Sequence, residues 1–184
     1  RDSYGKISQM ELSELIKDAK LQIDFMSQTI DDFRNFYKPS KEKKLFNIKE
    51  SIIQSSKIVN ASLEKYGIKF EIFGEDLQLD SYENEFEQVV VNILNNAIDA
   101  KIVKSNSEKF DARIEINIFK ENDNIVISIF NNCGNIDEQI IERIFEPYFT
   151  TKFENQGTGI GLYMTKVIVE KNMNGKIQAK NLND

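Results

Sequence analysis

Several residue types are absent or scarce in this 184-residue sequence, which has no histidine, one cysteine and two prolines. Without histidine, any reaction that needs an imidazole must obtain it from elsewhere. The single cysteine, Cys133, excludes an intramolecular disulfide and a multi-cysteine zinc site, which fits a reducing cytosol. No apolar run approaches the roughly 18 residues of a membrane span, and no signal peptide opens the sequence. We expect a cytoplasmic fragment without membrane contact, taken from a longer protein that could itself be membrane-anchored.

Positive charge is also scarce. The 24 basic residues are outnumbered by 30 acidic ones, which gives a formal net charge of −6. Broad attraction to nucleic acid or anionic lipid needs a basic field, so we expect no nucleic-acid partner. Any polyphosphate must therefore be bound locally. Because 40% of the residues are hydrophobic, the chain can form a packed core rather than remain disordered.

Residues 1–37 include a pattern typical of one long helix, from residue 7 to residue 37. Two apolar rows each repeat every seven residues, and the second is offset from the first by four. Such a pair of rows needs a partner surface, from another helix or another copy of the chain. The alternative is an ordinary amphipathic helix docked on its own domain. The rows consist of Leu12, Ala19, Met26 and Phe33, and of Ile16, Ile23, Ile30 and Tyr37.

A charged segment with a proline, residues 38–44, interrupts the helical pattern and predicts a linker. Residues 45–184 then form the second predicted domain, in which helical and strand-like periods alternate. This order predicts an α/β (α+β) fold, with helices packed on one face of a mixed sheet. The expected helices are 48–66, 82–103 and 160–171, and the expected strands are 68–72, 113–118, 125–129 and 176–180.

Residues 132–157 have weak periodicity, apart from a short helical pattern near residues 138–145. A loop of that length inside a compact domain is usually a functional cover or an error of assignment. We therefore expect this segment to cover a binding site.

The helix expected at 82–103 has two unlike sides at about 100° per residue. Amide oxygens on its polar side can complete the oxygen shell of a Mg²⁺ ion held mainly by phosphates and water. The alternative is that these asparagines cap or solvate an ordinary surface helix. The polar side consists of Gln88, Asn92, Asn96 and Asp99, and the apolar side of Phe86, Val90, Ile93, Leu94 and Ala97.

A run of glycines stands directly before the helix expected at 160–171. Gly157, Gly159 and Gly161 let the backbone approach phosphate oxygens closely. The following helix directs its free N–H groups and its positive dipole end at the same place, so an anion is expected there. The alternative is a generic flexible turn. The run lacks the lysine of a Walker loop and lies too late in the chain for a dinucleotide fold.

Three segments together resemble the ATP-binding domain of sensor histidine kinases, in the superfamily of gyrase, heat-shock chaperones, histidine kinases and mismatch-repair ATPases. Residues 87–100 resemble its asparagine box, residues 143–152 its phenylalanine box and residues 157–162 its second glycine box. The resemblance covers nearly all of the chain. It implies a two-layer sandwich of the Bergerat type that binds ATP, preceded by one long bundle helix.

The resemblance also implies roles for individual residues. Asn96 would be the Mg²⁺ ligand, Asn92 would lie beside the triphosphate, and residues 132–157 would form the lid over ATP. Asn131 would face the adenine amino group. The residues expected to bind nucleotide are Asn92, Asn96, Asn131, Lys152, Gly157, Thr158, Gly159, Gly161 and Leu162.

Residues 1–37 resemble the second helix of the family's dimerisation and phosphoacceptor hairpin, which implies a homodimer in the full-length protein. The family's acceptor histidine lies on the first helix, and this sequence has no histidine. We therefore expect no catalytic residue in this fragment and no autophosphorylation by it alone. The implied reaction moves the γ-phosphoryl group of ATP to a histidine on the missing helix, and then to an aspartate of a response regulator.

The first glycine box departs from the family pattern, because residues 131–136 replace the usual Asp-x-Gly-x-Gly run. The Asn131 amide can still accept a hydrogen bond from adenine, but the loss of charge costs about 1 kcal/mol. Asn135 tolerates a left-handed backbone better than most residues. Asp99 also departs, since many relatives have a lysine there. The alternative function is a nucleotide-poor docking module with the same fold.

Asn92 bears on the choice between kinase and hydrolase. Hydrolytic relatives have a glutamate at this position, whereas a neutral amide cannot take a proton from water. A gyrase-type ATPase is therefore only the third candidate function, after the histidine kinase and the docking module. We expect Asn92→Glu not to improve phosphotransfer.

Cys133 has no basic neighbour in the sequence, which is typical of an inert thiol. The alternative is a redox sensor at the hinge of the expected lid.

Overall fold

The computed structural model describes residues 11–17, 19–20, 23, 27, 42–105, 110–152 and 157–182. The described residues between 11 and 27 are helical, as their periodicity predicts. Leu12, Ile16 and Ile23 of the two apolar rows are exposed there. Met26 and the row positions after it lie outside the described residues. No helix in these ranges is both long enough and apolar enough to cross a membrane.

The domain after residue 42 contains the predicted helices and hairpin within a few residues of their expected bounds. Its elements, in chain order, are β1 (Lys44–Asn47), α2 (Ile48–Lys65), β2 (Lys69–Gly74), β3 (Gln78–Ser81), α3 (Glu83–Ser105), β4 (Arg113–Glu121), β5 (Asn124–Asn131), α4 (Gly161–Val167) and the π-helical turn η1 (Ile168–Asn172). Strands β1 and β3 were not predicted. Each has four residues, too few for an alternating pattern to be recognised.

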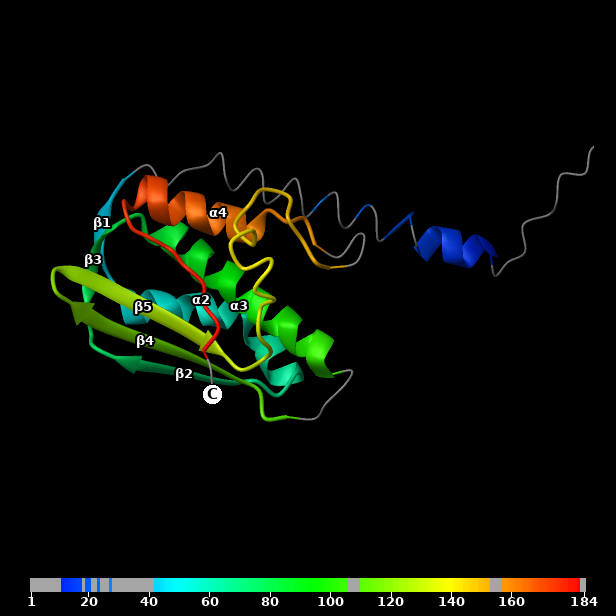
Figure 1. The fold of residues 1–184 in the computed structure, drawn as a ribbon, viewed down its shortest axis with the longest axis horizontal. Helices are drawn as coiled ribbons and strands as arrows, with labels where there is room; N and C mark the ends of the chain where they lie inside the picture. Colours follow the sequence, from blue (N-terminus) through cyan, green and yellow to red (C-terminus); the bar gives the residue numbers. More distant parts are fainter. Residues whose placement is uncertain are drawn as a thin grey trace, which may run out of the picture.

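The main sheet has three strands in the order β2-β4-β5, and it is mixed. Strand β2 pairs with β4 in parallel, whereas β4 and β5 form the expected antiparallel hairpin. Helices α2, α3 and α4 lie on one side of this sheet (Figure 1). The predicted α/β (α+β) class, with helices on one face of a mixed sheet, is therefore confirmed. Strands β1 and β3 form a separate antiparallel pair.

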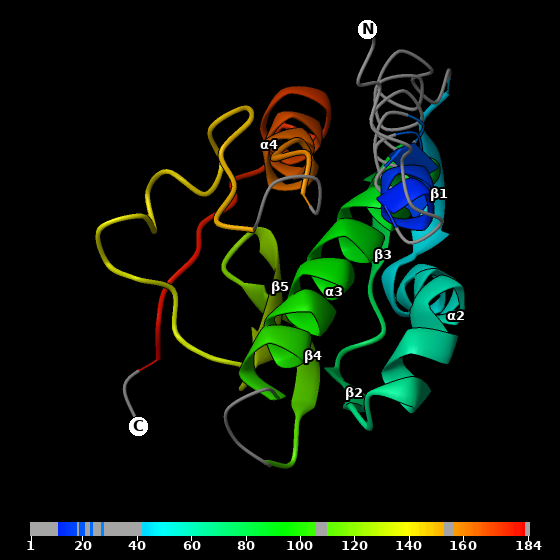
Figure 2. The ribbon, with the colours of Figure 1, turned by 90° about the vertical axis from the view of Figure 1, so that its right-hand side faces the viewer.

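The core lies between the sheet and the helices. Ile114, Ile116 and Ile118 of β4 alternate with polar residues, and all three are fully buried because strand side chains point to opposite faces in turn. They belong to one cluster with Ile52 of α2 and Leu94 of α3. This packing fixes α3 against the sheet. Figure 2 shows α3 between α2 and α4.

Two predicted elements are wrong. Residues 138–145 form consecutive turns instead of a helix, with Ile141 N–H donating to the carbonyl of Asp137 at 3.1 Å. Residues 176–180 form no strand. Their exposure still alternates, but the chain is held by one side chain instead of a backbone ladder: the Asn181 amide bonds both N–H and C=O of Ile136, at 2.8 and 2.6 Å.

Candidate functional site

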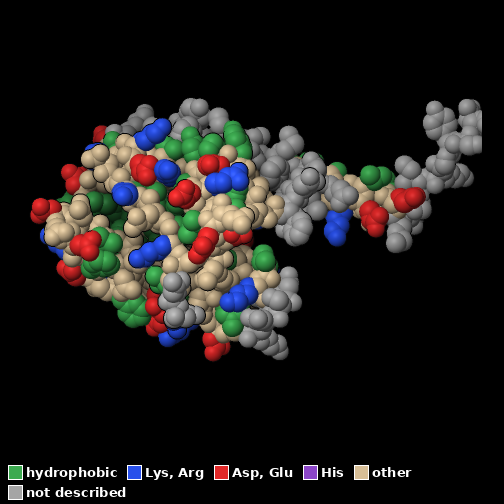
Figure 3. All heavy atoms as spheres, in the orientation of Figure 1, with side chains coloured by type: hydrophobic (Ala, Val, Ile, Leu, Met, Phe, Trp, Pro, Cys, Tyr) green, Lys and Arg blue, Asp and Glu red, His purple; other side chains and the backbone are tan. Residues whose placement is uncertain are grey.

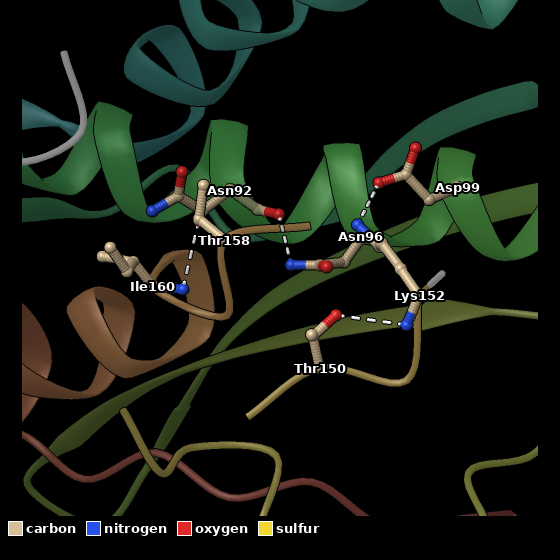
Figure 4. A network of polar contacts seen from close by, with 7 residues as sticks. All are labelled: Asn92, Asn96, Asp99, Thr150, Lys152, Thr158 and Ile160. Carbon is tan, nitrogen blue, oxygen red and sulfur yellow. Dashed lines mark hydrogen bonds and ion pairs between the residues drawn. The ribbon is translucent and has the colours of Figure 1, made fainter. Parts of the chain in front are cut away.

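Helix α3 has the two sides that its sequence predicts. Phe86, Val90, Leu94 and Ala97 are buried in the core. Asn92, Asn96 and Asp99 are half-buried and lie on the other side. Figure 4 shows Asn96 and Asp99 beside the segment that carries Thr150 and Lys152. Each polar residue of this side makes a different contact.

Asn92 connects α3 to the start of α4. Its Nδ2 atom donates to the carbonyl of Gly161 at 3.2 Å and lies 3.5 Å from Oγ1 of Thr165. The buried Thr165 hydroxyl donates to the same Gly161 carbonyl at 3.0 Å. The asparagine box and the second glycine box, expected to share one site, are thus in direct contact.

Asn96 folds its amide nitrogen back on its own helix. Nδ2 donates to the carbonyl of Asn92 at 2.9 Å. Among the described residues, its Oδ1 atom has no hydrogen-bond partner, and amide oxygens are suitable ligands for a hard cation such as Mg²⁺. The donor chemistry at Asn96 therefore fits the metal role expected of it.

Lys152, at the end of the phenylalanine box, reaches α3. Its Nζ atom lies 2.5 Å from Oδ2 of Asp99, in an ion pair whose side chains are 32% and 41% exposed. Its backbone N–H donates to Oγ1 of Thr150 at 3.1 Å. A Cβ atom at Gly157 would lie 2.9 Å from Cδ of Lys152, so a glycine at 157 leaves room for the lysine side chain. This ion pair was not among the contacts predicted from the sequence.

Gly159 is packed against the backbone of Tyr148. The Tyr148 N–H donates to the Gly159 carbonyl at 3.0 Å. Gly159 has φ +64°, and a Cβ there would lie only 2.4 Å from the carbonyl carbon of Tyr148. Any other residue would be strained and would separate the two segments. The phenylalanine box therefore lies directly on the glycine loop, residues 157–161.

The glycine loop leads into α4 without a capping side chain. The residue before the helix is Ile160, which has no side-chain oxygen for the first N–H groups of α4. The Thr158 hydroxyl accepts from the N–H of Ile160 at 3.3 Å, and Leu162 is half-buried in the first helical turn. This geometry suits an anion at the start of α4.

The loop after β5 is held by asparagine side chains. Oδ1 of Asn131 accepts from the N–H of Cys133 at 3.1 Å. Asn132 accepts from the N–H of Arg113 at 2.8 Å and donates to the carbonyl of Asp111 at 2.9 Å. The two bonds of Asn132 join this loop to the residues at the start of β4. Unlike the Asn92 side chain, that of Asn131 bonds within its own loop.

The backbone requirement in this loop differs from the one expected. The positive φ, +132°, falls on Gly134, and the structure does not place Asn135 in the left-handed region. The loop therefore does not need the left-handed backbone conformation that Asn135 was expected to tolerate.

Cys133 is buried, with 3% of its surface exposed. Burial raises the pKa of its thiol, and the charges of Lys101 and Lys104 oppose this rise without cancelling it. These two lysines belong to α3, so the basic neighbours missing from the local sequence are supplied by the fold. Burial and a raised pKa are typical of an inert thiol, which is the interpretation that the sequence favoured.

Comparison with known proteins decides the family. Residues 81–183 match the sequence model of the family described as histidine kinase-, DNA gyrase B-, and HSP90-like ATPase. The chain belongs to this family. Within it, the catalytic domain of the histidine kinase ThkA is 30% identical, with a TM-score of 0.66 over 77% of this chain and 89% of that one. The resemblance found in the sequence is confirmed, and this is a histidine kinase ATPase domain of the two-component type.

Two curated relatives are sensor kinases. The two-component sensor PprA of Pseudomonas aeruginosa is 38% identical over 98 residues, which are 53% of this chain and 10% of PprA. Sporulation kinase A of Bacillus subtilis is 25% identical over 169 residues, which are 91% of this chain and 24% of the kinase. The chain therefore spans a quarter or less of the length of these relatives.

A second ThkA structure has a similar fold over a longer stretch. It is a complex with the response regulator TrrA, and the kinase matches with a TM-score of 0.65 at 23% identity, over 99% of this chain and 49% of that one. This likeness concerns the fold.

Proposed function

We propose that this domain binds ATP and Mg²⁺ between the polar side of α3 and the glycine loop, and that the longer protein uses the bound ATP to phosphorylate a histidine. The family is described as one of ATPases. The proposal depends on one observation: two contacts, the Asn92–Gly161 hydrogen bond and the Lys152–Asp99 ion pair, join three distant segments at the same side of α3. Figure 4 draws the ion pair. These are the segments that the sequence assigns to a nucleotide.

The phosphates would lie at the glycine loop. The backbone at Gly157, Gly159 and Gly161 and the N–H groups at the start of α4 can donate to phosphate oxygens. The Thr158 hydroxyl would add a polar group within this loop, and the Lys152 ammonium, which meets Asp99 on α3, would add a positive charge.

Asn96 would hold the Mg²⁺ ion through Oδ1, because its nitrogen is already bonded to the Asn92 carbonyl. The ion would supply charge neutralisation along the phosphates. Asn131 would contact the adenine amino group through Oδ1, which has a second lone pair beyond the one that accepts from Cys133. Residues 132–157 would serve as the lid.

The phosphorylated group must come from outside this sequence, which has no histidine. An imidazole nitrogen would attack the γ-phosphorus, the bond to the β,γ-bridging oxygen would break, and ADP would leave. A response-regulator aspartate would then take the phosphoryl group. Asn92 does not assist water in this scheme, because its amide is not basic and its nitrogen donates to Gly161. Catalysis would depend mainly on alignment of the imidazole with the γ-phosphoryl group and on neutralisation of the phosphate charge.

The partners follow from the same scheme. We propose that residues 1–37 pair with the missing helix and with a second copy in the full-length protein, which acts in the cytoplasm. The response regulator TrrA binds the kinase ThkA, and a receiver domain of that class is the proposed partner here. On the face in Figure 3, basic and acidic side chains are interspersed, so this face offers no basic patch for nucleic acid.

Calorimetric titration with ATP and Mg²⁺ tests the binding step. We expect saturable binding by the wild-type chain, a loss of about tenfold or more in Asn96→Ala, and no loss in Asn95→Ala, an exposed neighbour on the same helix. Equal effects of the two substitutions would contradict the assignment of Asn96.

A second experiment tests the transfer step. A longer chain that includes the upstream helix and its histidine is incubated with ATP labelled in the γ-phosphate. The expected product is a protein phosphate that is labile in acid and stable in base. Label released only as inorganic phosphate would indicate hydrolysis instead.

The altered loop after β5 favours one alternative, a docking module that binds nucleotide poorly. Asn131 has no charge to strengthen a bond to adenine, and its Oδ1 already accepts from Cys133. Absence of ATP binding by the wild-type chain at millimolar concentration, together with binding of a receiver domain, would support this module.

A further inference from the structure

Asp99 lies on the proposed phosphate side of α3 although it has the same sign of charge as a phosphate. It follows Asn96 by one helical turn and Asn92 by two, so the three side chains share one side of the helix. An unpaired carboxylate here would repel a triphosphate. The structure pairs it with Lys152 at 2.5 Å, across 53 residues of sequence.

The contacts of Lys152 leave it able to serve a second anion. Its stem lies beside Gly157, and its backbone is fixed by the Thr150 hydroxyl. An ammonium group has three N–H donors. Asp99 takes one of them, and within the described residues no other acceptor contacts Nζ. Two donors are therefore left for phosphate oxygens while the ion pair persists.

We propose that Asp99 is a positioning residue for the phosphate-binding lysine. Its carboxylate holds the Lys152 ammonium over the polar side of α3, so that a cation from the phenylalanine box meets the triphosphate. The inference rests on the proposed function and deepens it, since it assigns a role to a residue that otherwise opposes anion binding. An ion pair this exposed contributes little to stability, so its main effect is on where the lysine lies. Holding the side chain in advance reduces the freedom lost on binding.

A double-mutant cycle measures this role. The affinity for ATP with Mg²⁺ is determined for the wild type, Asp99→Asn, Lys152→Gln and the double variant. We expect Lys152→Gln to weaken binding about tenfold in the wild type, and about twofold or less when Asp99→Asn is already present. Asp99→Glu, which keeps the carboxylate, should retain most of the coupling. The coupling should shrink at high salt.

Two results of the cycle overturn the proposal. An equal loss from Lys152→Gln in both backgrounds means that Asp99 does not position the lysine. A larger loss in the Asp99→Asn background means that Asp99 competes with the phosphates. Thermal unfolding of all four proteins is the folding check. If the ion pair had a purely structural role, its removal would change the unfolding temperature. The cycle would then show no coupling between Asp99 and Lys152 in the affinity for ATP.

Failure of the proposed function is recognised separately. If the wild type binds no ATP, amine labelling by acetic anhydride, followed by mass spectrometry, still reports on Lys152. Asp99→Asn should raise the labelling rate of Lys152 several-fold, while exposed Lys176 is unaffected. An unchanged rate at Lys152 would show that Asp99 does not hold it.

Discussion

The two sides of helix α3 contact the rest of the protein in different ways. On the apolar side, Val90 and Leu94 are almost completely buried in a cluster shared with the sheet and α2. On the polar side, Asn92 and Asp99 each meet one partner segment through one or two specific atoms, and remain half-buried. The contacts of the apolar side depend on the volume of the buried side chains. The contacts of the polar side depend on where hydrogen-bond donors and acceptors lie.

This difference separates stability from binding. Dispersion and burial are spread over many contacts, so the apolar side tolerates a change of shape better than a loss of volume. A hydrogen bond needs a donor opposite an acceptor, so an exchange of nitrogen for oxygen suffices to lose it. Four substitutions or conditions test the comparison, from the largest expected effect on stability to the smallest.

Leu94→Ala should have the largest effect. Leu94 is 0% exposed, and the cavity should lower the free energy of unfolding by about 2–5 kcal/mol. Urea unfolding measures the loss. Val103→Ala is the control, because Val103 lies on the same helix and is 70% exposed, so its effect should stay within about 0.5 kcal/mol. Similar losses in both variants would mean that α3 does not pack as described.

Asn92→Asp should be next. The substitution is nearly isosteric but replaces the donor that bonds the Gly161 carbonyl with an oxygen, at a cost of about 1–3 kcal/mol. Asn95→Asp introduces the same charge at an exposed position of α3 and should cost much less. Urea unfolding again compares the two. Equal costs would indicate that charge on the helix, not the bond to Gly161, is responsible.

Raising the pH should have a smaller effect, through Cys133. Because burial raises the pKa of this thiol in the folded state, folding favours the neutral form. The associated stability is present at neutral pH and is lost as the pH rises above the ordinary thiol pKa toward the raised one. Unfolding measured across this range should show the decline in the wild type and a smaller decline in Cys133→Ala. Identical pH profiles would contradict the expectation.

Asn96→Ala should have the smallest effect on stability. The lost bond to the Asn92 carbonyl is offset by the better helix propensity of alanine, so the change should stay within about 0.5 kcal/mol. The same variant is expected to bind ATP about tenfold or more weakly. A large loss of stability would mean that Asn96 supports the fold, and its binding defect could no longer be attributed to a metal ligand.

Much of the fold could be predicted because its signals are periodic. The alternation of Ile114, Ile116 and Ile118 predicts a strand with one buried face, and the seven-residue and helical repeats predict the long helices. Strands β1 and β3 are too short for such a signal. The segment 176–180 has the right alternation, but a strand needs a neighbouring backbone, and here the Asn181 side chain holds the chain instead.

The candidate site was predictable as a set of segments but not as a set of contacts. Three motifs in order indicated a nucleotide, and the family comparison agrees with them. Two contacts had no signal in the sequence: the bond between Tyr148 and Gly159, and the ion pair between Asp99 and Lys152. The basic neighbours of Cys133 also had no signal in the local sequence, because they come from α3, although the expectation of an inert thiol agrees with its burial.

The sequence by itself determined which side of each helix and strand is apolar, because that depends only on the repeat of the backbone and the order of side chains. It also determined that the chain cannot supply a histidine to accept phosphate. Only the tertiary structure decided that Asp99 meets Lys152 and that Asn92 meets Gly161. Those pairs form because packing of α3 and α4 above the sheet brings together residues more than 50 positions apart.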